Sequence, residues 1–400
     1  MTGDGSQGNP YVVMDAADLN SLRTLIVTSG TYPYVELGAD IDMSVYSVFT
    51  PLPASYCNFN GKGNRIYNLN ILTGSGNSGL FSQLTTQECK DVYIDGSVVG
   101  SSPATYGGIG IFAGVLHLIS SNGVISGIHC SGYLEGTLYS NSALGGVCGV
   151  LQCDSPSGTN NAMQNCSFHG TIKAMSTSAV TSINNTVPYL GGITGELLTK
   201  NGYGALSISK CITNLTAILD TTTANMGFGG VVGYFNSGGS LSLPAVDRCV
   251  AQMEVRILTA AASARTLLIG GIAAYSHQSV MPGPAQINRC AAHIKLHYDP
   301  PSTIAGIYFA GIYAYKVDSP VSISQSYSVM SIANPNTKPL PAAFTVDGIQ
   351  TYGTRSIMAS FYDAEVLAAS FSGTVVDASN GITTANMKSQ TFLEAQGWVF

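Results

Sequence analysis

Charged side chains are scarce in this sequence. Asp, Glu, Lys and Arg make up 10% of its 400 residues, against about 25% in an ordinary soluble domain. Lys and Arg together number 16, the formal net charge is −6, and no basic cluster appears along the chain. Because nucleic-acid binding needs a positive stripe that follows the phosphate backbone, the composition argues against a nucleic-acid partner.

Long apolar runs and targeting segments are also missing. The longest apolar stretch, from Ile109 to Ile119, contains Gly and His and is too short to cross a bilayer, so no membrane span is predicted. The first six residues lack the basic start and apolar core of a secretory signal. We therefore expect a soluble chain that either assembles in the cytoplasm or has lost a leader.

Motifs for catalysis and cofactor binding are absent too. The sequence has no His-Glu-x-x-His zinc motif, no Gly-x-Ser-x-Gly elbow and no phosphate loop. His293 and His297 would lie roughly 13 Å apart on a strand, a spacing that favours a solvated face over a metal site. We predict no catalytic residue, no cofactor and no metal ligand.

Acid pairs of the kind that polysaccharide hydrolases use are sparse as well. Such enzymes need two carboxyl groups roughly 5–9.5 Å apart. We expect Asp40 and Asp42 to be structural, and Asp91 and Asp95, which share strand parity, to protect an edge strand by charge. If the protein were an enzyme, it would be a polysaccharide hydrolase or lyase.

Glycine is abundant instead, and it marks a repeat of about 40 residues. Copies of Gly-Gly-Ile or Gly-Gly-Val recur, and a degenerate copy reads Ala-Gly-Ile. We assign the repeat corners to Gly108, Gly146, Gly192, Gly230, Gly271 and Gly311. Glycine suits a corner because it has no Cβ where two backbones approach closely.

A second landmark keeps the same spacing. Cysteines follow those glycines at similar distances: Cys130, Cys166, Cys211, Cys249 and Cys290. Strands of alternating apolar and polar residues come next. We predict an all-β solenoid, or β-helix, in which successive coils lie about 4.8 Å apart and these cysteines form one buried ladder. The nine cysteines are an odd number, which favours buried free thiols over a disulfide framework.

Both ends of the stack need covers, because the outer coils would otherwise expose unpaired edges. Residues 15–26 have the pattern of an amphipathic helix with Asp15 as N-cap, and a second helical piece begins at Thr383. Trp398, the single Trp, is expected to plug the last coil. We divide the chain into an N-terminal cap with a short helix and first strand (1–45), solenoid repeats (46–335) and a last coil with C-terminal cap (336–400).

Several segments resemble bacterial surface proteins that carry GLUG repeats. The resemblance rests on these segments: Gly-Asn-Pro-Tyr-Val-Val (8–13), Ala-Ala-Asp-Leu-Asn-Ser-Leu (16–22), Leu-Gly-Ala-Asp-Ile-Asp-Met (37–43), Phe-Asn-Gly-Lys-Gly-Asn-Arg-Ile (59–66), Ser-Gly-Leu-Phe (78–81), the Gly-Gly copies and Thr-Thr-Ala-Asn-Met-Lys (383–388). It covers most of the chain and implies a β-solenoid. It implies little about function, because such repeats occur in adhesins, in accessory regions of cell-surface proteases and in phage proteins.

The sequence departs from the usual pattern of that family by having no secretion signal and no wall anchor. We therefore expect a structural or receptor-binding phage component, a tail or head fibre or spike on the virion surface. It would form a homotrimer, contact other virion proteins and attach to a host-surface glycan or protein. A bacterial or archaeal cell-surface adhesin module, extracellular in location, and a polysaccharide-degrading tailspike remain alternatives.

Tyrosine is the residue type in the composition that best indicates a function. The chain has 21 of them, and Tyr32, Tyr34, Tyr308, Tyr313 and Tyr315 lie in dense groups. Flat rings with a hydroxyl suit contact with sugars or proteins, although packing in a core or between chains explains them equally well.

Overall fold

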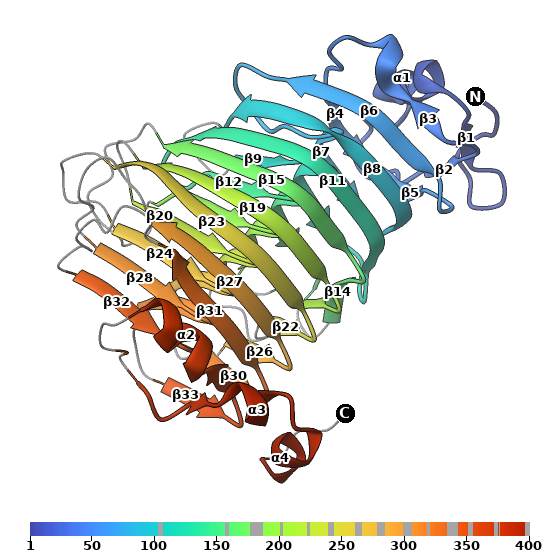
Figure 1. Ribbon diagram of the computed structural model, residues 1–400. Coiled ribbons are helices and arrows are strands. Elements are labelled where there is room, and N and C mark those ends of the chain that lie inside the picture. The colour runs from blue at the N-terminus through green and yellow to red at the C-terminus, as the bar shows by residue number, and fades with distance from the viewer. Residues whose placement is uncertain are drawn as a thin grey trace.

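Strands provide most of the regular structure, and they pair in parallel to form a β-solenoid, as the repeat predicts (Figure 1). The computed structural model describes residues 1–102, 107–156, 160–176, 187–200, 203–221, 225–238, 244–260, 266–277, 285–298, 306–317, 321–333, 343–350, 355–371, 375 and 377–396. Within these ranges the strands lie in three sheets of 20, 8 and 7 strands, called here the wide, second and third sheets.

The wide sheet receives two strands from a typical coil. Its members are β1 (Tyr11–Val13), β2 (Tyr34–Leu37), β3 (Ile41–Asp42), β5 (Asn58–Asn60), β6 (Arg65–Leu72), β8 (Glu88–Ser101), β11 (Val124–Leu138), β14 (Asn160–Gln164), β15 (Ser167–Ser176), β18 (Ala205–Ser209), β19 (Ile212–Thr221), β22 (Ala245–Asp247), β23 (Val250–Ala260), β26 (Ala285–Asn288), β27 (Ala291–Tyr298), β30 (Val321–Ser324), β31 (Tyr327–Ala333), β33 (Arg355–Met358), β34 (Phe361–Asp363) and β35 (Gly381–Ile382).

The other two sheets receive one strand each. The second sheet contains β4 (Leu52–Tyr56), β7 (Phe81–Thr86), β10 (Ala113–Leu118), β13 (Cys148–Cys153), β17 (Thr194–Lys200), β21 (Val232–Gly238), β25 (Ala273–His277) and β29 (Tyr313–Val317). The third contains β9 (Gly108–Gly110), β12 (Ala143–Gly145), β16 (Tyr189–Gly191), β20 (Met226–Gly229), β24 (Thr266–Gly270), β28 (Gly306–Ala310) and β32 (Ala343–Asp347).

One coil passes through the sheets in a fixed order. The chain runs along β18 and β19 in the wide sheet, β20 in the third and β21 in the second, and then begins the next coil at β22. Alternate side chains of every strand point inward, where Ile208, Leu219, Phe228 and Phe235 are buried in one continuous apolar core. No single coil encloses such a core, so each depends on its neighbours for stability.

The Gly-Gly pairs form the corner between the third and second sheets, and they explain its tightness. A Cβ on Gly230 would lie 2.0 Å from the carbonyl oxygen of Gly271 in the next coil, and a Cβ on Gly271 would lie 1.9 Å from that of Gly311. The register corrects one expected corner. Ile111, not Gly108, takes the position that Gly146 takes in the next coil, because Gly110 pairs with Gly145.

A similar correction applies to the cysteine ladder. Cys166, Cys211, Cys249 and Cys290 occupy one column, because the residues on either side of them pair from coil to coil. Cys130 is buried but lies two positions along, opposite Phe168, which leaves Ile128 in the ladder position of its own coil. Ser326 and Ser360 extend the column in the other direction.

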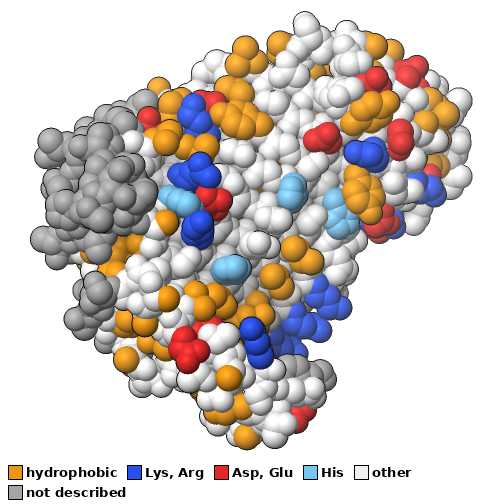
Figure 2. All heavy atoms as spheres, in the orientation of Figure 1, with side chains coloured by type: hydrophobic (Ala, Val, Ile, Leu, Met, Phe, Trp, Pro, Cys, Tyr) orange, Lys and Arg blue, Asp and Glu red, His pale blue; other side chains and the backbone are white. Residues whose placement is uncertain are grey.

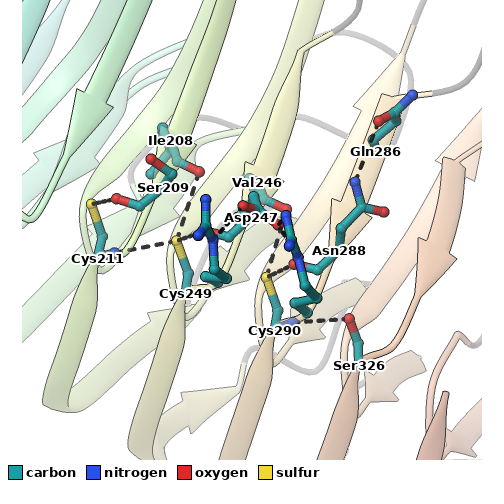
Figure 3. Close-up of polar contacts among 12 residues, drawn as sticks. Ile208, Ser209, Cys211, Val246, Asp247, Cys249, Gln286, Asn288, Cys290 and Ser326 are labelled. Carbon is teal, nitrogen blue, oxygen red and sulfur yellow. Dashed lines mark hydrogen bonds and ion pairs between the residues drawn. The ribbon is translucent and has the colours of Figure 1, made fainter. Parts of the chain in front are cut away.

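The ladder residues do more than fill space (Figure 3). The residue before each of them is left-handed, with φ between 45° and 55° from Asn165 to Ala359, and this kink interrupts the regular pairing. The thiol of Cys249 lies 3.5 Å from the carbonyl oxygen of Asp247, two residues earlier, and 3.5 Å from the backbone nitrogen of Cys211. The Ser326 hydroxyl repeats this pattern at 2.9 and 3.1 Å. A small group that donates and accepts therefore satisfies backbone atoms at each kink.

Helices lie at both ends of the stack. At the N-terminal end, α1 (Ala16–Leu25) begins at Asp15, whose carboxylate accepts from the Asp18 backbone at 2.8 Å, and it buries Leu19 and Leu22. A 3-10 turn follows at Met43–Val45. Near the C-terminus are α2 (Ala364–Ser370), which the sequence did not predict, α3 (Thr384–Met387) and α4 (Gln390–Ala395). The expected Trp398 plug lies outside the described residues. None of the helices described is long and apolar enough to cross a bilayer.

Candidate ligand-binding groove

The outer face of the wide sheet is hollowed where β8, β11 and β15 lie side by side. Inward residues of these strands, such as Ile94, Leu134 and Ile172, are buried in the core, so their neighbours in sequence point outward. Figure 2 shows this face, with histidines spread across it. A groove of about 450 Å³ is lined by Gly63, Arg65, Tyr93, Ile94, Asp95, His129, Cys130, Ser131, Ser167 and His169.

An aromatic pair forms one wall of this groove. Tyr93 and His129 occupy the same register position in adjacent coils, and their rings stack with centroids 4.8 Å apart and planes 25° apart. Tyr93 remains 47% exposed. The partly exposed Tyr93 side chain is therefore available to a planar or apolar group of a ligand.

His129 also reaches the third coil of the groove. Its Nδ1 lies 2.8 Å from the hydroxyl oxygen of Ser167. Burial lowers the pKa of His129, and the charge of Asp91 opposes this only in part. Because the usual value is near 6.5, the imidazole is neutral at pH 7 and can donate from one nitrogen and accept at the other.

A second column of polar side chains runs parallel to the first. Asp95, Ser131 and His169 pair in register on three successive strands, and the Ser131 hydroxyl donates to Asp95 Oδ1 at 3.2 Å. The next residue along each of the three strands is glycine. Gly132 has a φ of +124°, and a Cβ there would lie 2.0 Å from the Gly96 carbonyl oxygen, so only glycine allows this approach.

Farther along the same face an acid is paired with two basic side chains. Glu254 Oε1 lies 2.7 Å from an Arg256 guanidinium nitrogen and 2.6 Å from His297 Nε2. The hydrogen bond from Arg256 lowers the pKa of Glu254. His293, expected on a solvated strand face, lines a smaller hollow of about 200 Å³ with Gln252 and Lys295.

A re-entrant corner on the outer side of the second and third sheets carries the densest group of tyrosines. Tyr189, Tyr234, Tyr275 and Tyr315 stack in sequence, with centroids 4.1, 5.3 and 6.0 Å apart. Of the tyrosines that the sequence pointed to, Tyr308 and Tyr315 belong to this corner, and Tyr313 is buried with its hydroxyl 2.6 Å from Ser276 Oγ. Tyr32 packs against Tyr56. These rings pack against one another within the chain.

A buried acid lies beside this stack. Glu196 pairs in register with Val150 on one side and Tyr234 on the other and is 2% exposed. Burial raises its pKa to about 7, although the Asn236 amide, which donates at 2.7 Å, favours the ionised form. The acid is therefore largely protonated below neutral pH.

The acids considered in the sequence have structural places. Asp40 accepts from the Arg65 backbone at 2.8 Å, and Asp42 caps the 3-10 turn through Ser44 at 2.9 Å. Asp91 has a left-handed backbone, and β8, which carries Asp91 and Asp95, pairs on both sides rather than forming an edge. Asp95 is the one acid among the groove's lining residues.

Metal binding finds no support in the described part of the chain, where no three His, Cys, Asp or Glu side chains converge. All nine cysteines lie in that part and are buried free thiols. Burial raises the pKa of Cys57 well above its usual value and that of Cys148 to about 12. These two thiols are therefore poor nucleophiles.

The fold and the groove define a β-solenoid with a polar, partly aromatic hollow on its widest sheet. No protein-family model and no curated protein matches the chain. Among solved structures, it is similar to a protein from Bacteroides ovatus described as a "putative immunoglobulin A1 protease", with a TM-score of 0.51 and 20% identity over 87% of this chain and 86% of that one. At that identity the likeness concerns the fold alone.

Proposed function

We propose that this protein is a non-enzymatic attachment module that binds a surface glycan in the groove of the wide sheet. The observation that carries the proposal is the exposed Tyr93 ring stacked on a neutral His129, next to side chains that both donate and accept hydrogen bonds. Sugars present the matching surface, with apolar ring faces and hydroxyl groups around them.

Attachment fits the groove better than hydrolysis does. A glycosidase needs two carboxyl groups on opposite sides of the bond that it cleaves. The groove offers Asp95, and this carboxylate accepts a hydrogen bond from Ser131. The chain is therefore proposed to hold a polysaccharide without cutting it.

The proposed setting is a phage fibre or spike made of three identical chains. Two features support this setting: a surface poor in charge and nine cysteines that remain free thiols, as in proteins that fold in a reducing compartment. A solution mass of three chains, measured by light scattering, is the expected result, and a monomer would count against the trimer.

The binding site is tested with an array of bacterial surface polysaccharides. We expect at least one neutral glycan to bind, and Tyr93→Ala to weaken that binding about tenfold, which corresponds to roughly 1.4 kcal/mol. Tyr139→Ala is the matched control, since Tyr139 is similarly exposed but follows the far end of β11. Equal binding by wild type and Tyr93→Ala would refute the groove, and new reducing ends in the bound polysaccharide would make the protein a hydrolase.

A further inference from the structure

Three cations line up beside the cysteine ladder. Lys210, Arg248 and Arg289 each precede a ladder cysteine, in three successive coils, and their φ angles are 55°, 51° and 52°. We call them the basic stripe. Figure 2 shows Lys and Arg side chains gathered at the edge of the molecule near the ends of β22 and β26. A linear reading of the sequence misses this group because its members lie about 40 residues apart.

The stripe keeps a net positive charge. Asp247 bridges the two arginines, with Oδ2 at 2.7 Å from Arg248 Nε and Oδ1 at 2.7 Å from an Arg289 guanidinium nitrogen. Both guanidinium side chains remain about half exposed, at 50% and 48%. Lys210 is exposed, and no acidic side chain is within ion-pair distance of it among the described residues. One carboxylate thus faces three cations in a protein whose net charge is −6.

The left-handed backbone conformation does not require long basic side chains. A left-handed residue is most easily Gly or Asn, because other side chains crowd the backbone there. The same column contains Gly127 and Asn165 in the two preceding coils, at φ 64° and 54°. The fold is therefore satisfied by small residues at this position, and the change to Lys and Arg adds charge at some conformational cost.

Apolar side chains run alongside the cations. Ile212 and Val250 follow Lys210 and Arg248 by two residues and are 56% and 44% exposed, and Tyr327 continues their column. The edge thus offers a row of charges next to a row of apolar surface. Adjacent coils lie about 4.8 Å apart, so the three cations span roughly 10 Å along the solenoid axis.

We propose that the basic stripe is a second binding surface, which takes a linear anionic polysaccharide with a carboxylate on its sugars. The guanidinium groups hold carboxylates in bidentate fashion, and the adjoining apolar row receives the ring faces. The site is built from different strands than the groove, and its apolar row begins at Ile212, one coil beyond the groove residue Ser167. Three cations with one acid between them are too few to hold a duplex nucleic acid, whose binding sites neutralise more phosphates.

The test uses polygalacturonate as the probe and dextran as the neutral comparison. The wild-type protein is expected to bind polygalacturonate and not dextran, with an affinity that falls as salt rises. The triple variant Lys210→Asn, Arg248→Asn and Arg289→Asn is expected to bind at least tenfold more weakly. It should fold normally, because Asn165 occupies the same column natively. An unchanged circular dichroism spectrum and a melting temperature no lower than that of the wild type verify this.

Two controls isolate the stripe. Lys173→Asn, Arg256→Asn and Lys295→Asn remove the same number of cations from the wide-sheet face and should leave the affinity for polygalacturonate unchanged. Tyr93→Ala should also leave it unchanged, so failure of the groove and failure of the stripe give different results. The proposal is overturned if the stripe variant binds like the wild type, or if both triple variants lose binding equally. It is also overturned if the wild type binds vesicles of phosphatidylglycerol but not polygalacturonate.

Discussion

Glu196 makes the stability of the solenoid depend on pH in a way that a single substitution removes. Its carboxyl group is buried in the re-entrant corner, and its pKa is raised from 4.5 to about 7 by burial. In the unfolded chain the same group titrates near its ordinary value. A difference of that size corresponds to a free energy on the order of 3 kcal/mol.

The direction of the pH dependence follows from whether the folded or the unfolded state holds the proton. Below about pH 4.5 the carboxyl is protonated in both states, and the folded protein has its full stability. Between about pH 4.5 and 7 the unfolded chain releases the proton while the folded protein keeps it, so stability falls as pH rises. Above pH 7 the folded protein must contain a buried carboxylate, whose main compensation is the hydrogen bond from Asn236.

Glu196→Gln tests this reasoning because glutamine can still accept from Asn236 but does not titrate. We expect the urea midpoint of the variant, relative to wild type, to rise from about pH 4.5 to about pH 7 and to level off at higher pH. The midpoint is the proper readout, since a stack of coils need not unfold in one step. Glu254→Gln is the control. Glu254 is more exposed to solvent than Glu196 and its pKa is lowered, so the urea midpoint of this variant, relative to wild type, should not rise over that pH range. A difference between wild type and Glu196→Gln that stays constant across this range would refute the buried, protonated acid.

Two further substitutions test the column positions. Cys249→Ser should lower the free energy of unfolding by less than about 1 kcal/mol, since serine holds the equivalent position at 326 and 360. Cys249→Ala should lower it by about 1–3 kcal/mol, because it leaves backbone groups unpaired. Equal urea midpoints for the two variants would contradict the hydrogen-bonding role. Gly230→Ala should destabilise by about 3 kcal/mol or more, because its Cβ would meet the Gly271 carbonyl oxygen at 2.0 Å, and Gly74→Ala, with open space around it, should leave the melting temperature unchanged.

The architecture was predictable because glycine and cysteine recur in register with the coils. The corner needs residues without a Cβ, and the kink needs a small donor and acceptor, so both leave a strong trace in the sequence. In the first of these copies the prediction misplaced the corner by three residues and the ladder position by two. Gly108 and Gly110 offered two alignments, and Ile128 occupies the ladder position that Cys130 seemed to fill. The longer spacing from Gly108 to Cys130 was the available signal of that slip.

The groove and the basic stripe could not be read from the sequence in the same way. Tyr93, His129 and Ser167 lie 36 and 38 residues apart, and they meet because they share one register position. That position tolerates many side chains, since it points to solvent and the core does not constrain it. Once the left-handed column is known, the outward residues of each coil follow by counting, and both surfaces emerge from the numbering.

The column arrangement also gives the molecule an unusual route for evolutionary change. Each coil contributes one residue to each column, and the spacing from Gly146 to Gly192 exceeds that from Gly192 to Gly230 without disturbing the pairing of these positions. A duplicated coil would lengthen the molecule and add one more side chain to every column while the register of the rest stayed intact. Ligand preference can therefore drift coil by coil, with the fold inherited unchanged.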